Sequence, residues 1–113
     1  MKTVVALLIA VSVGGSPSFI NLHPHERLAR GFYQDKDDDI TVTVATQDTK
    51  LDLLCGLFDK DEKVALEIDR GSTCFMHVPK MPYTGKYVVV IKNKSPNDAE
   101  LLLTIYTDDS FHW

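Results

Sequence analysis

The side chains best suited to chemistry in this sequence include Cys55 and Cys74, the only two cysteines in 113 residues. An even cysteine count in a short chain is typical of one disulfide formed in an oxidising compartment. The alternative is two buried free thiols that act as small hydrophobic side chains. Neither cysteine has further ligands at zinc-site spacing, and their apolar surroundings do not suit a reactive thiolate. We therefore expect a disulfide between them.

A run of aspartates offers a second kind of chemistry. Asp35, Asp37 and Asp39 could supply the hard oxygen ligands that calcium prefers. Their spacing does not match an EF-hand loop, so the alternative is a solvated acidic run that precedes a strand. Calcium is the candidate cofactor, and these three aspartates are its candidate ligands.

Histidines form the third group of candidates. His23 and His25 would lie on one side of an extended segment and could bind a transition metal with a third donor. The alternative is that they belong to an exposed linker without a metal. His77 has the opposite parity to its apolar neighbours, so we expect it on a sheet surface, without a nucleophile beside it.

Motifs of the common enzyme classes are absent from the sequence. It contains no G-x-S-x-G, no glycine-rich phosphate loop and no H-E-x-x-H. Carboxylate pairs are present, but they fall in segments rich in turn formers, where solvation accounts for them. We expect a protein without enzymatic activity.

The overall composition limits the size of the fold and the class of partner. Hydrophobic residues make up 44% of the chain and charged residues 25%, which is typical of one globular domain. The 12 Lys and Arg residues are outnumbered by 16 Asp and Glu, so the net charge is -4. Nucleic-acid binding needs a clustered basic surface, and we therefore expect no nucleic-acid partner.

The first 15 residues are typical of a secretory signal peptide. Met1 and Lys2 form a short positive start, residues 3–13 are apolar or small, and residues 14–16 are small enough for cleavage. We expect cleavage after Gly15 and a secreted or periplasmic product. The apolar run is shorter than the roughly 20 residues of a membrane span, so we expect no stable membrane insertion. The alternative is a buried strand of an intracellular protein.

The rest of the chain has the pattern of short strands separated by turns. A linker is expected over residues 16–27, followed by one domain over residues 28–113. Turn formers separate the apolar segments, and no helical period of useful length appears. We predict an all-β fold, an antiparallel, jelly-roll-like β-sandwich of about seven to eight strands. The expected strands, the first of which ends at residues 31–34, continue over residues 40–45, 51–58, 64–68, 72–78, 86–92 and 99–107.

Alternation within these segments predicts which side chains form the core. Both cysteines lie on the apolar parity of their segments, so both sulfurs should point inward. The segments 86–92 and 99–107 are expected to be neighbouring strands joined by one polar loop. The expected core side chains are Leu51, Leu53, Cys55, Leu57, Cys74, Met76, Val78, Tyr87, Val89, Ile91, Leu101, Leu103 and Ile105.

Two smaller features lie near the C-terminus. Asn93-Lys94-Ser95 is an N-glycosylation pattern in a loop that we expect to be exposed, although the following Pro96 lowers its use. Phe111, His112 and Trp113 either pack back over a sheet edge or form a terminus that a partner binds.

Three short motifs stand in a characteristic order: Leu51-Asp52-Leu53, the turn at residues 59–63 and Gly85-Lys86-Tyr87. With them, the order of the segments over roughly residues 28–107 resembles the bacterial pre-peptidase C-terminal domain. One departure is Glu62, which stands where the family's turn has glycine. The pattern is also similar to the calpain β-sandwich and Golgi-dynamics domains.

The resemblance implies a non-catalytic role. Domains of this family are appendages of secreted hydrolases that aid secretion, stability or substrate attachment, and some relatives bind collagen and calcium. We therefore expect a secreted interaction module that binds a protein or polysaccharide partner. The alternative is a structural domain, or a calpain-like sandwich that associates with membranes through calcium and would be intracellular.

Overall fold

A computed structural model describes residues 16–107 of the chain, which contain eight strands and no helix. Alternating apolar and polar residues explain the strands, because successive side chains point to opposite faces. Within these residues, no helix has the length and apolar composition needed to cross a membrane. The strands are β1 (Ser16–Leu22), β2 (Arg27–Gln34), β3 (Ile40–Ala45), β4 (Leu53–Asp59), β5 (Ala65–Gly71), β6 (Cys74–Val78), β7 (Gly85–Asn93) and β8 (Ala99–Thr107).

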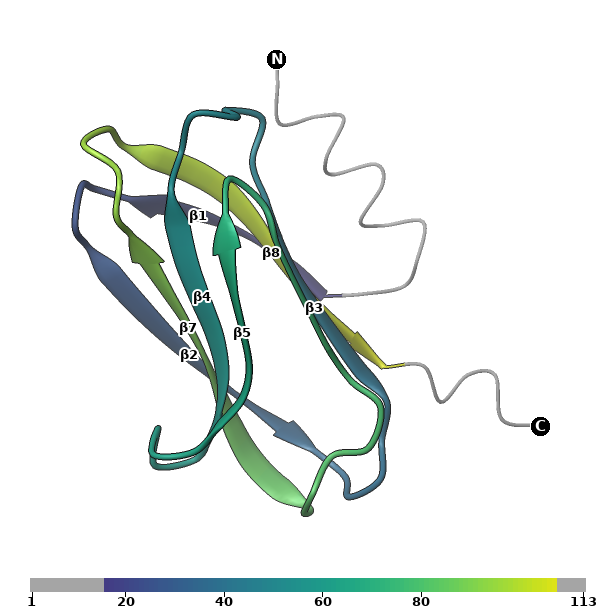
Figure 1. Cartoon of the computed structure of the whole chain (residues 1–113). Coiled ribbons are helices and arrows are strands. Elements are labelled where there is room, and N and C mark those ends of the chain that lie inside the picture. Colours follow the sequence, from purple (N-terminus) through teal and green to yellow (C-terminus); the bar gives the residue numbers. More distant parts are fainter. Residues whose placement is uncertain (1–15, 108–113) are drawn as a thin grey trace.

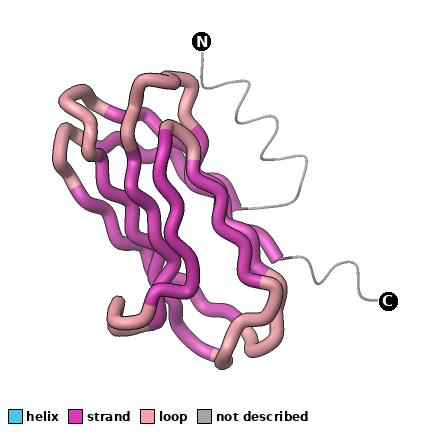
Figure 2. The backbone as a smooth tube through the Cα atoms, viewed as in Figure 1, coloured by secondary structure: helices cyan, strands magenta, loops and turns pink. Residues whose placement is uncertain are grey.

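The strands form two four-stranded sheets that pack face to face (Figure 1). Sheet A has the order β1-β8-β3-β6, and sheet B has the order β2-β7-β4-β5. Every pairing within the sheets is antiparallel. The strands run along the length of the molecule, with the turns gathered at its two ends (Figure 2). The predicted all-β sandwich is confirmed.

The core between the sheets follows the predicted alternation. Leu53, Cys55 and Leu57 point inward from β4 and are at most 1% exposed. Of the expected core residues, Val78 and Ile105 are partly buried and pack against the core. The outward positions of the same strands are therefore the ones left to form the surfaces of the sandwich.

The structure differs from the sequence-based expectation at the N-terminal boundary. Residues 16–27 were expected to form a linker, but Ser16–Leu22 is strand β1, which pairs with β8 over its whole length. Ile20 and Leu22 are buried in the core. Pro17 is compatible with this strand although it lacks a backbone N–H, because β1 is an edge strand, where proline is tolerated. The linker expectation is thus wrong for residues 16–22.

A second difference concerns the last two strands. They were expected to be neighbouring strands joined by one polar loop, but they do not pair, because β7 lies in sheet B and β8 in sheet A. Their apolar faces meet across the core, and the segment between them crosses from one sheet to the other. This arrangement explains why both strands carry long apolar runs without pairing with each other.

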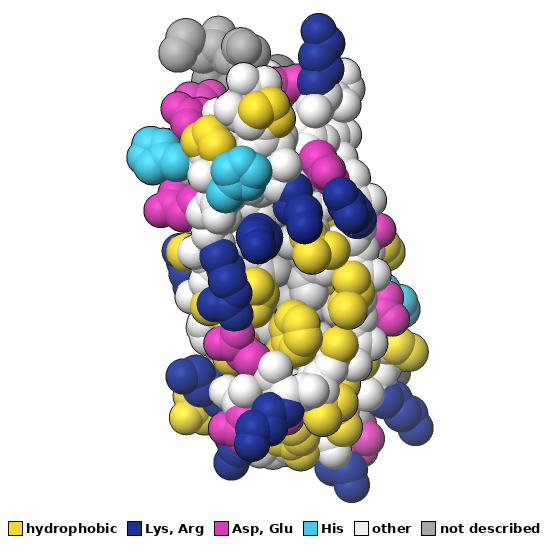
Figure 3. Space-filling view, turned by 60° about the vertical axis from the view of Figure 1, so that its left-hand side comes forward, with side chains coloured by type: hydrophobic (Ala, Val, Ile, Leu, Met, Phe, Trp, Pro, Cys, Tyr) yellow, Lys and Arg dark blue, Asp and Glu magenta, His cyan; other side chains and the backbone are white. Residues whose placement is uncertain are grey.

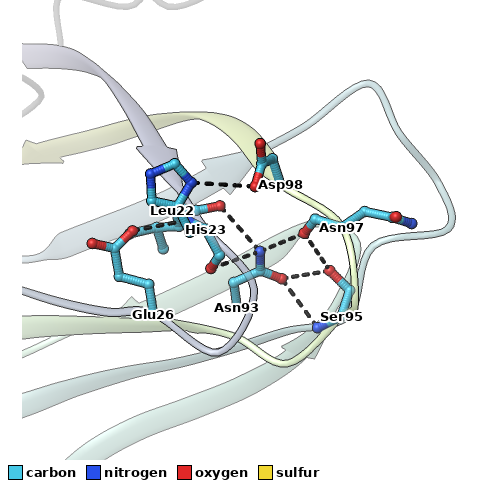
Figure 4. A network of polar contacts seen from close by, with 7 residues as sticks. All are labelled: Leu22, His23, Glu26, Asn93, Ser95, Asn97 and Asp98. Atoms are coloured by element: carbon cyan, nitrogen blue, oxygen red, sulfur yellow. Dashed lines mark hydrogen bonds and ion pairs between the residues drawn. The ribbon is translucent and has the colours of Figure 1, made fainter.

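Asn93 anchors this crossing and is fully buried (Figure 4). Its side-chain amide donates to the carbonyl oxygens of Leu22, His23 and Asn97 at 2.8 to 3.2 Å. Its carbonyl oxygen accepts from the backbone N–H and the hydroxyl of Ser95. The expectation of an exposed glycosylation loop is therefore wrong, because a fully buried amide nitrogen cannot carry a glycan in the folded protein.

Candidate functional site

The outer face of sheet B contains a hollow of about 170 Å³ centred on β4. Gly56 faces outward in β4, and its register partners are Ile68 of β5 and Val90 of β7. Leu54 and Phe58 stand two residues before and after it on the same face of the strand. We call this site the sheet B hollow, and it is lined by Arg27, Leu54, Cys55, Gly56, Phe58, Ile68, Val90 and Lys92.

The glycine explains why the face is hollow at this point. A Cβ atom placed on Gly56 would lie 2.3 Å from Cε1 of Phe58, so the Phe58 ring leans over the glycine. Any larger side chain at this position would push the ring aside and fill the floor. Ile68 is 58% exposed although it is a large apolar residue. The hollow therefore presents accessible apolar surface.

Cationic side chains border the hollow at one end. Arg27 of β2 and Lys92 of β7 are register partners, and both line the hollow. Arg70 of β5 donates two hydrogen bonds to Asp52, at 3.0 and 2.7 Å. Figure 3 views this side of the molecule, where apolar side chains gather below a band of Lys and Arg. The hollow thus combines an apolar floor with a basic border.

Two of the border cations are neutralised by carboxylates. Arg27 forms an ion pair with Glu62, and Arg70 forms one with Asp52. The Arg70 hydrogen bond lowers the pKa of Asp52, and Asp52 in turn raises the pKa of Arg70. Within the described part of the chain, Lys92 has no carboxylate within ion-pair distance. The face therefore keeps local positive charge in a chain whose net charge is -4.

The predicted disulfide is present and lies beside this site. Cys55 and Cys74 are bonded, with Cα atoms 6.4 Å apart. The bond joins β4 of sheet B to the edge strand β6 of sheet A. The alternative of two free thiols is thereby set aside, because the structure contains no free cysteine.

The predicted calcium ligands are not brought together. The Asp35 N–H donates to Asp38 Oδ2 at 3.3 Å, and the Asp37 N–H donates to the Met81 carbonyl at 2.8 Å. Asp39 Oδ1 instead accepts a hydrogen bond from the His77 ring, whose Nε2 lies 2.7 Å away. Across residues 16–107, no three His, Cys, Asp or Glu side chains gather closely enough to hold a metal ion. The run shapes the turn between β2 and β3, and calcium binding there stays a prediction.

None of the three histidine candidates belongs to a cluster of three or more metal-ligating side chains within residues 16–107. His23 Nδ1 lies 3.2 Å from Asp98 Oδ1, with both side chains mostly exposed. His25 adopts a left-handed backbone with φ of 66°, and its N–H donates to the Asn93 carbonyl. The pair therefore shapes the turn between β1 and β2. His77 lies on the outer face of sheet A, as its parity predicts.

The sheet B hollow itself was missed by the sequence reasoning. The available signal was Gly56, a single glycine inside an apolar strand, which often marks a close approach of other groups. The outward parity of Leu54 and Phe58 was a second signal. Neither signal shows that Ile68 and Val90 lie on the two sides of Gly56, because this placement depends on how β5, β4 and β7 pair.

Comparison with known proteins shows a similar fold in distant proteins. No family model and no curated protein match the sequence. The Yersinia pseudotuberculosis-derived mitogen has a TM-score of 0.69 at 8% identity, covering 85% of this chain and 87% of that chain. The pre-peptidase C-terminal domain of collagenase from Bacillus anthracis gives 0.67 at 12% identity, covering 81% and 89%. PliG of Aeromonas hydrophila, a periplasmic inhibitor of g-type lysozyme, gives 0.65 at 10% identity, covering 83% and 86%.

These similarities bear on the fold alone, because every identity is low. The resemblance inferred from the sequence is confirmed at that level, since a pre-peptidase C-terminal domain is among the similar structures. The chain has a β-sandwich fold similar to that of the pre-peptidase C-terminal domain.

Proposed function

We propose that this protein is a secreted, non-catalytic module that binds a protein partner through the outer face of sheet B. The observation that carries the proposal is the sheet B hollow, an apolar depression with cations along its border. Contiguous exposed apolar surface of this kind often marks an interaction site, because its burial removes apolar area from water. A volume of about 170 Å³ is suited to one inserted side chain.

The comparisons support a protein as the class of partner. Among proteins of similar fold, one is named as an inhibitor of g-type lysozyme, which is itself a protein. A sandwich of this size can therefore serve as a protein-binding module without a catalytic domain. The names of the three similar proteins described above do not mention a polysaccharide partner.

Secretion is supported by two independent features. The disulfide needs an oxidising compartment to form and persist in most organisms. The first 15 residues, which lie outside the described part of the chain, have the composition of a signal peptide. Among the similar proteins, PliG is described as periplasmic. The mass of the natural mature protein tests this part of the proposal directly.

The test of the binding face uses one matched pair of substitutions. Ile68 of β5 is 58% exposed beside the hollow, and Phe75 of β6 is 59% exposed on the outer face of sheet A. Both residues lie on edge strands, so Ile68→Glu and Phe75→Glu place the same charge in equivalent surroundings on the two faces. Peptides selected from a phage-displayed random library on the unaltered protein serve as the binding probes.

We expect Ile68→Glu to weaken binding of the selected peptides about tenfold or more, because a bound peptide would remove the new carboxylate from water without giving it a partner. Phe75→Glu should leave their affinity unchanged. Affinities are measured by isothermal titration calorimetry, after circular dichroism has shown that both variants fold. Equal losses in both variants, or full binding by Ile68→Glu, would refute the proposed face.

A further inference from the structure

One ion pair spans the face on which the sheet B hollow lies. Arg27 begins β2, whereas Glu62 belongs to the turn between β4 and β5. The two side chains are 51% and 34% exposed, so water reaches both of them. The guanidinium that borders the hollow is therefore held by a carboxylate from the chain's own turn.

The turn does not need that carboxylate for its structure. Oδ1 of Asp59 accepts hydrogen bonds from the N–H groups of Lys63 and Val64, at 2.8 and 3.1 Å. The backbone N–H of Glu62 donates to the Asp59 carbonyl at 3.0 Å, and Asp59 N–H donates to the Val64 carbonyl. The contacts that shape the turn therefore involve the backbone of Glu62 and not its side chain.

We infer that the partner presents an acidic protein segment, in which an apolar side chain enters the sheet B hollow and a neighbouring carboxylate replaces Glu62 on Arg27. A second carboxylate of the segment binds Lys92. This inference rests on the proposed function. Glu62 is then an internal competitor that lowers the affinity for the partner's acidic segment.

Charge complementarity is the reason for proposing an acidic segment as the partner. Arg27 and Lys92 stand opposite each other in the register of β2 and β7, so their side chains leave the sheet as neighbours. In the described residues the single carboxylate within ion-pair distance of either side chain is that of Glu62. The rest of the chain is acidic, so it repels an acidic segment and favours its approach to this face.

The Arg27–Glu62 ion pair is weak enough for a carboxylate of the partner to replace Glu62. Exposed ion pairs contribute about 0.2–1 kcal/mol, because water screens them and two side chains lose freedom. That amount corresponds to a change in affinity of up to about fivefold. An incoming carboxylate can therefore replace Glu62 without disturbing the fold.

The first experiment compares two end-blocked peptides, in which one leucine is flanked by two aspartates or by two asparagines. Each is titrated into the ¹⁵N-labelled protein at low salt and followed by NMR. We expect the aspartate peptide to bind about two to five times more tightly, since one exposed ion pair is added at Lys92 while the pair of Arg27 is exchanged. The amide signals of Gly56 and Val90 should shift during the titration. Binding that weakens with added salt would agree with the same contacts.

The second experiment identifies the role of Glu62. Glu62→Gln should tighten binding of the aspartate peptide about two- to fivefold and leave the asparagine peptide unchanged. Glu67→Gln is the matched control, because it removes the same charge from an exposed position on β5. In the Arg27→Gln background, Glu62→Gln should produce no gain.

The outcomes separate the inference from the proposed function. If both peptides bind equally at this face, or if Glu67→Gln tightens binding as much as Glu62→Gln, the inference is wrong while the binding face remains. If neither peptide shifts the amides of this face, the inference is overturned together with the proposed binding face.

Discussion

The two outer faces of the sandwich are built on the same strand geometry but differ in charge and shape. None of the four strands of sheet A contains Lys or Arg, whereas those of sheet B contain Arg27, Arg30, Arg70, Lys86 and Lys92. Sheet A has a shallow depression of about 50 Å³ near β1, compared with about 170 Å³ on sheet B. The core positions require similar residues in both sheets, so the outward positions are free to make the faces different.

The outward residues of sheet A explain its plainer surface. Thr41 and Thr43 alternate with the buried valines of β3, which favours a strand while keeping its outer side hydrated. Phe19 and Phe75 are exposed there, but they stand on the two edge strands at opposite sides of the sheet. On sheet B, by contrast, the apolar side chains of Ile68, Phe58 and Val90 line one hollow, so they form a candidate binding site.

The largest expected effect comes from removing the covalent link between the sheets. The double substitution Cys55→Ala and Cys74→Ala should lower the free energy of unfolding by about 3 kcal/mol, because the unfolded chain regains the freedom of a closed loop. Urea denaturation of the oxidised protein and the variant measures this difference. A reducing agent should destabilise the unaltered protein and leave the variant unaffected. Equal stability of the two oxidised proteins would contradict the prediction.

A smaller effect is expected when alanine replaces one of two glycines on the outer face of sheet B, Gly56 or Gly31. A Cβ at Gly56 would strike the Phe58 ring, whereas at Gly31 it would lie 2.6 Å from Cε of Lys86, a flexible side chain that can move. We expect Gly56→Ala to lower the free energy of unfolding by about 1 kcal/mol and to reduce peptide binding, because the floor of the hollow is filled. Gly31→Ala should change both by little. Chemical denaturation measures the stability of both variants, and peptide titration measures their affinity. Similar losses in both variants would contradict the prediction that the hollow depends on the missing side chain at Gly56.

The smallest effect concerns the pH dependence of the turn that carries Glu62. Hydrogen bonds from Val64 and Lys63 lower the pKa of Asp59 below its ordinary 3.8. A lowered pKa in the folded state means that the stabilisation is present above pH 3.8 and is lost as pH falls through the folded value. The unaltered protein should therefore lose part of its advantage over Asp59→Asn in strong acid.

The measurement is the unfolding free energy of both proteins from neutral pH down to acid. Asp61→Asn is the control, since it removes the same charge from the turn without removing the two backbone hydrogen bonds of Asp59. A difference between Asp59→Asn and the unaltered protein that stays constant with pH would show that the carboxylate is not stabilised by folding.

Much of the fold could be predicted because burial imposes a period of two on each strand. Residues 40–45 and 99–107 were predicted with the bounds that the structure gives to β3 and β8. Cys55 and Cys74 were expected to point inward, and both are buried and bonded. Strand β1 was missed because residues 16–27 were assigned to a linker that follows the expected cleavage site, whereas Ser16–Leu22 pairs with β8.

The candidate site could not be predicted because it depends on strand order. Gly56 is flanked by Ile68 and Val90 only when β4 lies between β5 and β7. Local sequence also contains no information that pairs Arg27 with Glu62 across 35 positions. The aspartate run shows the same dependence, since Asp35, Asp37 and Asp39 are close in sequence but contact different groups in the structure, and calcium binding there stays a prediction.

The burial of Asn93 has a consequence for the choice of expression host. In the endoplasmic reticulum, oligosaccharyl transfer acts on chains as they emerge, before an interior amide is enclosed. A sugar attached to Asn93 at that stage would occupy the space of the Leu22 and Asn97 carbonyls and keep the two sheets from closing. Production in a bacterial periplasm supplies oxidising conditions for the cysteines without exposing the newly made chain to this modification.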